Sequence, residues 1–455
     1  MNKRGIHSIL LLCLTLFGFI GLTLTNDAYA KHAQPNIIII FTDDQGWADI
    51  GVHNADKDVK TPFIDQMANN GVSFRHAYVT APQCMPSRAG LMTGRYQNRF
   101  GFEQNLDGPL PLDQPTLAER LQTAGYTTGL AGKWHLERIL ARAWSRQQKN
   151  ALMEKFPGDA QRYAPGGRGF DEYLFGNMNS YQATHTSDGK PLAKNTSLRD
   201  ERYRIDVKSD WALSFIDRHA KDNKPFFLYL SYYAPHVPSQ STTKYLQRFD
   251  KVPDTTRRTG LAMIAAIDDG VGQIRDRLRK HKIEKNTLLF FISDNGAPLG
   301  EKWNGSLNTP LAGEKGDLLD GGIRVPFLME WPGTLRAGQI LDQPVISLDV
   351  ATTIFPLAGI ETNDALDGED LIPYVLGKQH QLSDRPLFWR WRDQAAVRQG
   401  DWKYIHYADG TRQLFNLRNE TSEAANLINS HQHIAKKLAK QLDKWTTELV
   451  PPGLP

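Results

Sequence analysis

Four apolar, β-branched or aromatic runs, each ending abruptly in polar residues, constrain the fold of this chain most strongly. The runs cover residues 37–41, 126–131, 226–233 and 288–292, and their apolar character is continuous rather than alternating. Continuous apolar strands are typical of a mostly parallel sheet that helices cover on both faces. The sequence therefore predicts an α/β fold with a large, mostly parallel central sheet.

Segments with helical spacing lie between and after these runs. Residues 115–124, 206–218 and 258–280 place apolar side chains at intervals of three and four, as in helices that pack one face on a sheet. The polar stretch 141–205 contains several turn signals, and we expect it to form surface excursions that shape a substrate cleft.

The last part of the chain has a different pattern, with short aromatic pieces at residues 387–391, 402–406 and 414–417, followed by a helical stretch at 434–449. This pattern predicts a small antiparallel sheet closed by a helix. We therefore expect a catalytic domain over residues 31–376 and a C-terminal subdomain over residues 377–455.

The first 30 residues resemble a secretory signal peptide. Lys3 and Arg4 precede an apolar stretch at residues 9–24, and Ala28-Tyr29-Ala30 is a small-x-small cleavage site. No later stretch approaches the roughly 20 apolar residues that a membrane span needs. The sequence thus predicts an exported protein, periplasmic or secreted, with no membrane span.

Composition adds little to this prediction. The 54 basic and 50 acidic residues give a formal net charge of +4, a balance that favours no class of partner by itself. Of the two cysteines, Cys13 lies inside the predicted signal peptide, so Cys84 has no partner for an internal disulfide.

Polar side chains with catalytic chemistry directly follow the four predicted strands. Parallel strands present their carboxyl ends at one edge of a sheet, where ligands bind in such folds, so these side chains should meet in a single site. They are Asp43 and Asp44 after the first run, Lys133 and His135 after the second, His236 after the third, and Asp294 and Asn295 after the fourth.

A motif around Cys84 resembles that of a known enzyme family. Cys84-x-Pro86-Ser87-Arg88, followed by Leu91-x-Thr93-Gly94-Arg95, is similar to the signature of the type I sulfatases, which belong to the alkaline-phosphatase-like superfamily. The resemblance covers most of residues 36–375 and implies that fold. It also implies that a formylglycine-generating or anaerobic sulfatase-maturating enzyme oxidises Cys84 to formylglycine.

Formylglycine explains how such an enzyme would cleave a sulfate ester. One hydroxyl of the hydrated aldehyde attacks sulfur and forms a covalent sulfated intermediate. Deprotonation of the second hydroxyl then expels sulfate and restores the aldehyde. The alternative for Cys84 is a buried, inert thiol.

The resemblance also implies a metal site. Asp43, Asp44, Asp294 and Asn295, together with an oxygen of modified Cys84, match the ligands of the family. Carboxylate and amide oxygens suit Ca²⁺ or Mg²⁺ rather than zinc, and we expect Ca²⁺ in preference to Mg²⁺.

Further catalytic roles follow from the same resemblance. Arg88 would support the modified side chain, and Lys133 would hold a sulfate oxygen. His135 would be the base of the elimination step, His236 the general acid for the leaving alcohol, and Lys315 a bridge between nucleophile and sulfate. Lys133, His236 and Lys315 would thus also bind substrate.

Substrate recognition is expected from aromatic and basic side chains. Tryptophans can stack on sugars, and arginines can bind neighbouring sulfates or carboxylates. The candidates are Trp47, Trp134, Trp303, Trp389 and Trp391, with Arg99, Arg168, Arg390 and Arg392.

The predicted function is removal of sulfate from a sulfated carbohydrate, a marine polysaccharide with carrageenan preferred over ulvan or glycosaminoglycan. No nucleic-acid partner is expected. One alternative is a phosphodiester or phosphonate monoester hydrolase of the same superfamily. Another is a non-catalytic glycan-binding protein in which Cys84 stays a thiol.

Overall fold

A ten-stranded sheet forms the centre of the computed structural model, which describes residues 34–105, 107–138, 145–362, 365–418 and 421–451. Residues 34–455 form one compact unit. The predicted signal peptide lies outside the described residues, and the predicted boundary at residues 376 and 377 stays a prediction. None of the described helices is long and apolar enough to span a bilayer.

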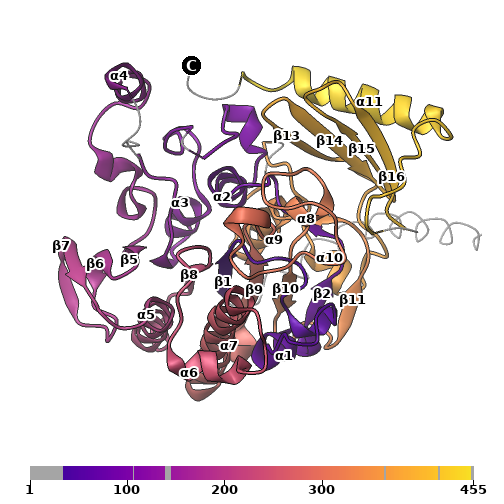
Figure 1. Cartoon of the computed structure of the whole chain (residues 1–455). Coiled ribbons are helices and arrows are strands. Elements are labelled where there is room, and N and C mark those ends of the chain that lie inside the picture. The colour runs from indigo at the N-terminus through magenta and orange to yellow at the C-terminus, as the bar shows by residue number, and fades with distance from the viewer. Residues whose placement is uncertain (1–33, 106, 139–144, 363–364, 419–420, 452–455) are drawn as a thin grey trace, which may run out of the picture. The chain divides into compact units, whose positions relative to one another are not determined.

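The four predicted strands are confirmed, and they are neighbours in the order β9-β1-β8-β4 (Figure 1). β1 (Asn36–Asp43) runs parallel to both β8 (Phe226–Pro235) and β9 (Thr287–Ser293), and β4 (Thr127–Gly132) runs parallel to β8. The carboxyl ends of all four strands therefore lie at one edge of the sheet.

Further strands extend the sheet at both of its edges. Beyond β4 lie β5 (Glu172–Asn177), which is parallel to β4, and the antiparallel β6 (Ser180–His185) and β7 (Pro191–Arg199). Beyond β9 lie β10 (Phe327–Glu330), β2 (Val72–Phe74) and β11 (Gln339–Leu341). A short two-stranded sheet pairs β3 (Ala77–Tyr78) with β12 (Val345–Ile346).

The strands β5 to β7 correct the expectation that residues 141–205 are only surface excursions. The side chains of β7 are exposed or half-buried along its whole length, so this edge strand lacks the apolar run that marks a central strand. Periodicity therefore gave no signal for it.

Helices cover both faces of the sheet, as the fold class predicts. Ile37 and Ile39 of β1 pack in one apolar core with residues of α2 (Cys84–Thr93), α3 (Leu117–Thr123) and α9 (Leu348–Leu357). Ile38 and Ile40 pack in a second core with residues of α1 (Pro62–Asn70), α5 (Arg204–His219) and α7 (Thr255–His281). The alternation of neighbouring side chains between two cores explains why the strand is apolar throughout.

The four predicted helical segments correspond to α3, α5, α7 and α11 (Gln432–Thr447), with small shifts at their ends. The α3 helix begins after a capping box in which the side chains of Thr116 and Glu119 bond each other's backbone N–H groups. The helices are α1 (Pro62–Asn70), α2 (Cys84–Thr93), α3 (Leu117–Thr123), α4 (Arg146–Lys155), α5 (Arg204–His219), α6 (Thr243–Leu246), α7 (Thr255–His281), α8 (Asp320–Ile323), α9 (Leu348–Leu357), α10 (Ile372–Val375) and α11 (Gln432–Thr447).

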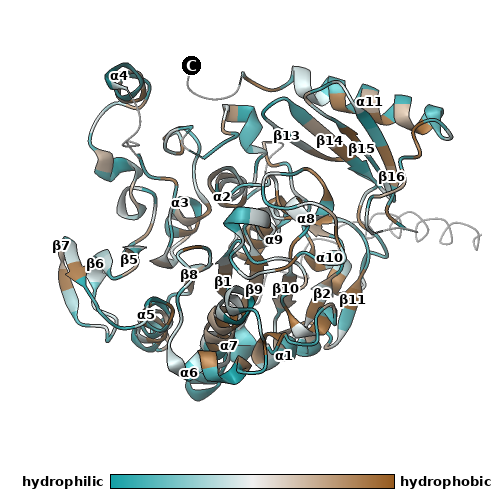
Figure 2. Ribbon diagram, in the orientation of Figure 1, coloured by the Kyte–Doolittle hydropathy of each residue, from teal (hydrophilic) through white to brown (hydrophobic). Residues whose placement is uncertain are grey.

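The C-terminal part is a four-stranded antiparallel sheet covered by α11, in agreement with the prediction. The α11 helix shows apolar and polar bands in Figure 2, and its Leu438, Leu442 and Trp445 are buried. The strands, in spatial order, are β13 (Leu387–Trp391), β14 (Gln394–Gln399), β15 (Trp402–His406) and β16 (Arg412–Asn416). The sequence missed β14, which has no aromatic residue.

Buried polar contacts attach this sheet to the rest of the chain. Trp389 donates a hydrogen bond from Nε1 to the backbone oxygen of Val79, at 2.7 Å. The buried ammonium of Lys403 lies 2.8 Å from Asp320 Oδ1 and 2.7 Å from Glu423 Oε1. The Trp389 contact holds β13 beside the segment that leads into α2, and the pair of Lys403 with Asp320 joins β15 to α8.

Gly132 allows β4 and β8 to approach closely at their carboxyl ends. Its φ is +115°, and a β-carbon there would lie 1.7 Å from the backbone oxygen of Ser231. We expect Gly132→Ala to lower the free energy of unfolding by about 3 kcal/mol or more, measured by urea denaturation. The matched control Gly125→Ala has a similar φ of +91° but open space, so it should cost only about 1 kcal/mol. Equal losses would contradict this account.

Candidate active site

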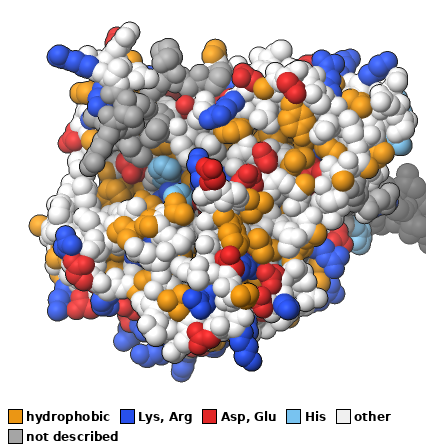
Figure 3. Space-filling model, viewed as in Figure 1, with side chains coloured by type: hydrophobic (Ala, Val, Ile, Leu, Met, Phe, Trp, Pro, Cys, Tyr) orange, Lys and Arg blue, Asp and Glu red, His pale blue; other side chains and the backbone are white. Residues whose placement is uncertain are grey.

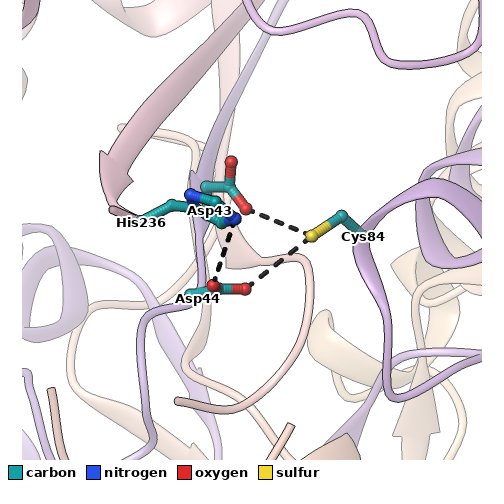
Figure 4. Close-up of side chains that lie close together, drawn as sticks. All are labelled: Asp43, Asp44, Cys84 and His236. Atoms are coloured by element: carbon teal, nitrogen blue, oxygen red, sulfur yellow. Dashed lines mark hydrogen bonds and ion pairs between the residues drawn. The ribbon is translucent and has the colours of Figure 1, made fainter. Parts of the chain in front are cut away.

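The predicted site residues from distant segments converge at the carboxyl edge of the parallel strands (Figure 4). Asp43 ends β1, Asp44 follows it, and Cys84 is the first residue of α2. Ligand atoms of these three residues and of His236 all lie within 4.8 Å of one another. Histidine side chains are visible beside acidic and basic ones on the face seen in Figure 3.

The Cys84 thiol is buried between two carboxylates. Its Sγ lies 3.4 Å from Asp43 Oδ1 and 3.7 Å from Asp44 Oδ1, and the residue is 1% exposed. Burial, and next the charge of Asp294, raise the pKa of this thiol well above its usual value. Since the thiolate is the reactive form of cysteine, an unmodified Cys84 would be a poor nucleophile.

Three cationic side chains neutralise the carboxylates of the site. Lys133 Nζ lies 2.6 Å from Asp43 Oδ2, and Lys315 Nζ lies 2.7 Å from Asp44 Oδ1. Arg88 Nη2 lies 2.7 Å from Asp294 Oδ2. Burial opposes the charged form of Asp43, but Lys133 and the other nearby cations outweigh it and hold the pKa of Asp43 well below its usual range.

Asn295 gives the clearest indication that the site fits a cation. Its Nδ2 donates a hydrogen bond to Asp44 Oδ1 at 2.7 Å, while its Oδ1 is buried with no partner among the described residues. Burial and the neighbouring Asp43 raise the pKa of Asp294 to about 6, because carboxylates crowd this pocket. A buried, unpartnered amide oxygen among carboxylates is the oxygen-rich donor set that Ca²⁺ and Mg²⁺ prefer.

Sequence reasoning missed the residues that hold Arg88 in place. Arg88 Nη1 donates to Ser231 Oγ at 2.6 Å, and it lies 3.3 Å from Tyr229 Oη. Both residues belong to β8, inside an apolar run. A hydroxyl in a strand buried on both faces was the available signal, because such a group needs a partner.

The two candidate histidines differ in their surroundings. His236 Nδ1 donates to the backbone oxygen of Val237 at 2.7 Å, and its Nε2 lies 3.6 Å from Asp44 Oδ2. His135 has a φ of +59°, and its Nδ1 is buried without a partner among the described residues. Burial, and next Lys133, lower the pKa of His135 well below its usual value, so this imidazole is neutral at neutral pH.

Arg204 supports the segment that carries His236, and the sequence offered no pattern for it. From the first turn of α5, its Nη2 donates to the backbone oxygens of His236 and Pro238, both at 3.0 Å. The residue is 3% exposed and has no carboxylate partner among the described residues. It therefore fixes the position of the backbone beside the candidate acid.

Comparison with known proteins identifies the family. The sulfatase family profile matches residues 35–360, and the profile of the N-sulphoglucosamine sulphohydrolase C-terminal region matches residues 314–448. This chain belongs to the sulfatase family. The enzyme is thus a sulfuric ester hydrolase, in a family that generally uses formylglycine and a divalent metal ion.

Relatives of this sulfatase include enzymes named for a sugar sulfate. It is 34% identical to N-acetylgalactosamine-6-sulfatase of Sus scrofa, over 78% of this chain and 68% of that protein. Among solved structures, Ps i-CgsB in complex with k-i-k-neocarrahexaose is 32% identical, with a TM-score of 0.79 over 92% of this chain and 94% of that chain. The phosphonate monoester hydrolase of Silicibacter pomeroyi shares the fold, with a TM-score of 0.64, 20% identity, and 92% and 96% of the two chains covered.

The structure corrects most of the predicted sugar-stacking tryptophans of this sulfatase. Trp134, Trp389 and Trp391 are 1%, 0% and 7% exposed and belong to the apolar cores, so they cannot stack on a substrate. Trp47 already stacks on His53, with ring centroids 3.9 Å apart. Trp303 is half-buried, and its Nε1 bonds the backbone oxygen of Ser306.

Three of the four predicted sulfate-reading arginines are occupied within the protein. Arg99 lies 2.8 Å from Asp367 Oδ1, and Arg390 is paired with Glu103. Arg168 is buried and donates to the backbone oxygens of Leu110 and Gln114. Arg392 is exposed and has no carboxylate partner in the described part of the chain.

Ca²⁺ should stabilise this sulfatase, because a ligand that binds only the folded state adds about 2.7 kcal/mol at a hundred times its Kd. We expect Ca²⁺ to raise the Tm of the chelator-treated protein in differential scanning calorimetry. Asn295→Ala should lose this response because it removes the unpartnered oxygen, whereas Asn69→Ala, at an exposed position of α1, should keep it. A Tm that is independent of Ca²⁺ in the unaltered protein would refute the metal site.

Proposed function

We propose that this sulfatase removes sulfate from a sulfated marine polysaccharide or its oligosaccharides, with carrageenan as the preferred substrate. The observation that carries the proposal is the protonated, buried Cys84 between Asp43 and Asp44 in a family that uses formylglycine. A thiol in this position is not activated as a nucleophile itself, which supports its conversion to the aldehyde. Relatives named for a sugar sulfate, and a related structure that holds a neocarrahexaose, support a carbohydrate of the carrageenan type.

The side chains around Cys84 have complementary proposed roles. One hydroxyl of the Cys84-derived hydrate attacks sulfur as the alcohol leaves, and loss of a proton from the other hydroxyl expels sulfate and restores the aldehyde. Lys133 and Lys315 hold sulfate oxygens, and Arg88 holds the modified side chain. In the elimination step, the neutral imidazole of His135 takes the proton of the second hydroxyl. His236, on the more exposed side of the site, protonates the leaving alcohol.

Asp43, Asp44, Asp294 and Asn295, with an oxygen of modified Cys84, are proposed to hold a divalent cation, Ca²⁺ rather than Mg²⁺. When bound, such an ion withdraws negative charge from sulfate oxygens as a Lewis acid. The three carboxylates need this ion or the nearby cations, because a buried carboxylate without a partner is costly.

Maturation and export complete the proposal. A formylglycine-generating or anaerobic sulfatase-maturating enzyme acts on Cys84, and the predicted signal peptide directs the enzyme out of the cytoplasm. The catalytic domain over residues 31–376 and the C-terminal subdomain over residues 377–455 remain the proposed division of the chain.

Sulfate release from carrageenans, ulvan and glycosaminoglycans tests this proposal, with protein whose Cys84 conversion is verified by peptide mass. Release from carrageenan alone supports the preferred substrate, and release from ulvan or glycosaminoglycan replaces it. Converted protein that releases nothing from this panel, but hydrolyses phosphodiesters or phosphonate monoesters, would favour that rival class, whose fold is similar. Binding to the polysaccharides without any turnover would favour the glycan-binding alternative.

Replacement of the nucleophile should abolish turnover. We expect Cys84→Ala to reduce sulfate release by about a thousandfold or more, because no other residue replaces a covalent nucleophile. Circular dichroism and Tm should stay close to those of the unaltered protein. Comparable activity in the folded variant would end the formylglycine mechanism.

The acid role of His236 predicts a dependence on the leaving group. His236→Ala should reduce kcat/KM about a hundredfold or more on sugar sulfates, whose alcohols need a proton to leave, and much less on 4-nitrophenyl sulfate, whose phenolate leaves unaided. His433→Ala, at an exposed histidine of α11, is the control and should change neither value. Equal losses of His236→Ala on both substrates would contradict general-acid catalysis.

A further inference from the structure

We propose that Arg392 forms a second anion-binding subsite beside the active site. It would take an oxyanion on a sugar next to the one that loses its sulfate, either a second sulfate or a uronate carboxylate. This inference rests on the proposed function, and it goes further by predicting that the preferred substrate carries more than one negative group.

Two contacts of the β13–β14 hairpin place Arg392 close to the active site. The ring of the preceding Trp391 packs on the loop of Lys315, since a β-carbon on Gly316 would lie 3.5 Å from Trp391 Cη2. On the other side, Arg392 Nε donates to Gln104 Oε1 at 3.3 Å.

Gln104 connects Arg392 to the residue that carries the chemistry. The next residue, Asn105, accepts a hydrogen bond at Oδ1 from the backbone N–H of Met85 at 3.0 Å, and its own N–H donates to Gln83 Oε1. Gln83 and Met85 flank Cys84. Arg392 therefore contacts the segment that supports the start of α2.

The guanidinium of Arg392 is available for a ligand. Its central carbon lies 4.6 Å from the centre of the Trp391 ring, so the ring holds the cation in place. No carboxylate pairs with it, and its Nη atoms have no hydrogen-bond partner among the described residues. A planar guanidinium with free N–H groups matches sulfate and carboxylate oxygens in a bidentate contact.

The backbone conformation at Arg392 also supports a role for its side chain. Trp391 pairs with Gln394 across the hairpin, so Arg392 and Asp393 form a two-residue turn. The turns that suit such hairpins need a positive φ at the first central residue, where glycine or asparagine is favoured. Arg392 has a φ of +55° there. An arginine at this position costs conformational energy, which favours a role for its side chain.

The site already described does not provide for a second anion. Lys133 and Lys315 are paired with Asp43 and Asp44 and are assigned to the sulfate that is cleaved. A polysulfated or uronate-containing chain presents further charges one sugar away, and a guanidinium placed there can bind such a charge through charge-assisted hydrogen bonds.

The test compares substrates that differ in one neighbouring charge. Arg392→Gln and the unaltered enzyme are assayed on carrageenan oligosaccharides with and without a sulfate on the adjacent sugar, on a matched pair with and without an adjacent uronate carboxylate, and on 4-nitrophenyl sulfate. We expect the variant to raise KM about tenfold on the substrate with the adjacent anion and to leave the singly charged substrates unchanged. The pair that responds identifies the anion as sulfate or carboxylate.

The matched control is Arg336→Gln. Arg336 is exposed and follows β10, whose last residue pairs near the start of β9, so it lies at the edge of the sheet opposite the active site. It should change no value. Equal KM changes on all substrates, or an unaltered enzyme that gains nothing from either adjacent anion, would overturn the subsite. Absence of sulfate release from every substrate by the unaltered enzyme would instead refute the proposed function. Arg392→Lys, which keeps the charge but not the bidentate edge, serves as a second variant if Arg392→Gln does not fold.

Discussion

Mutual neutralisation of buried charges is the interaction on which the rest of this structure depends. Asp43, Asp44 and Asp294 are at most 2% exposed, and Lys133, Lys315 and Arg88 each contact at least one of them. Removing one member would leave an uncompensated buried charge, which costs several kcal/mol. The network and its burial also shape the chemistry, because the cations hold the pKa of Asp43 low, whereas burial raises the pKa of the Cys84 thiol and lowers that of His135.

The sheet provides the geometry for this network. Strand order β9-β1-β8-β4 makes neighbours of four segments that are far apart in the sequence, and their parallel direction places every polar terminus at one edge. The close approach at Gly132 keeps Lys133 within reach of Asp43. The C-terminal sheet is part of the same arrangement, because Trp391 packs on the loop of Lys315 and Arg392 on the segment beside Cys84.

Prediction from the sequence succeeded where burial leaves a periodic signal. The central strands, the long helices α5, α7 and α11, and the C-terminal sheet were recognisable because apolar residues line the faces that pack. It failed at β5 to β7 and β14, which lack the long continuous apolar runs of the central strands. It also failed for the sugar-stacking tryptophans, because the sequence does not distinguish a tryptophan in a core from one in a cleft. Arg204 and Ser231 were missed because their partners are distant in the chain.

By itself, the sequence determined the class of fold, the motif around Cys84 and the polar residues that end each central strand, because these depend on local chemistry and on short-range spacing. Only the tertiary structure decided which charges pair, which histidine nitrogen faces the site and which arginine keeps a free guanidinium. Those properties depend on the partner that each group meets after folding. Because the groups are buried, loss of such a partner costs several kcal/mol of folding free energy. Sequence spacing carries no information about contacts between residues 200 or more positions apart.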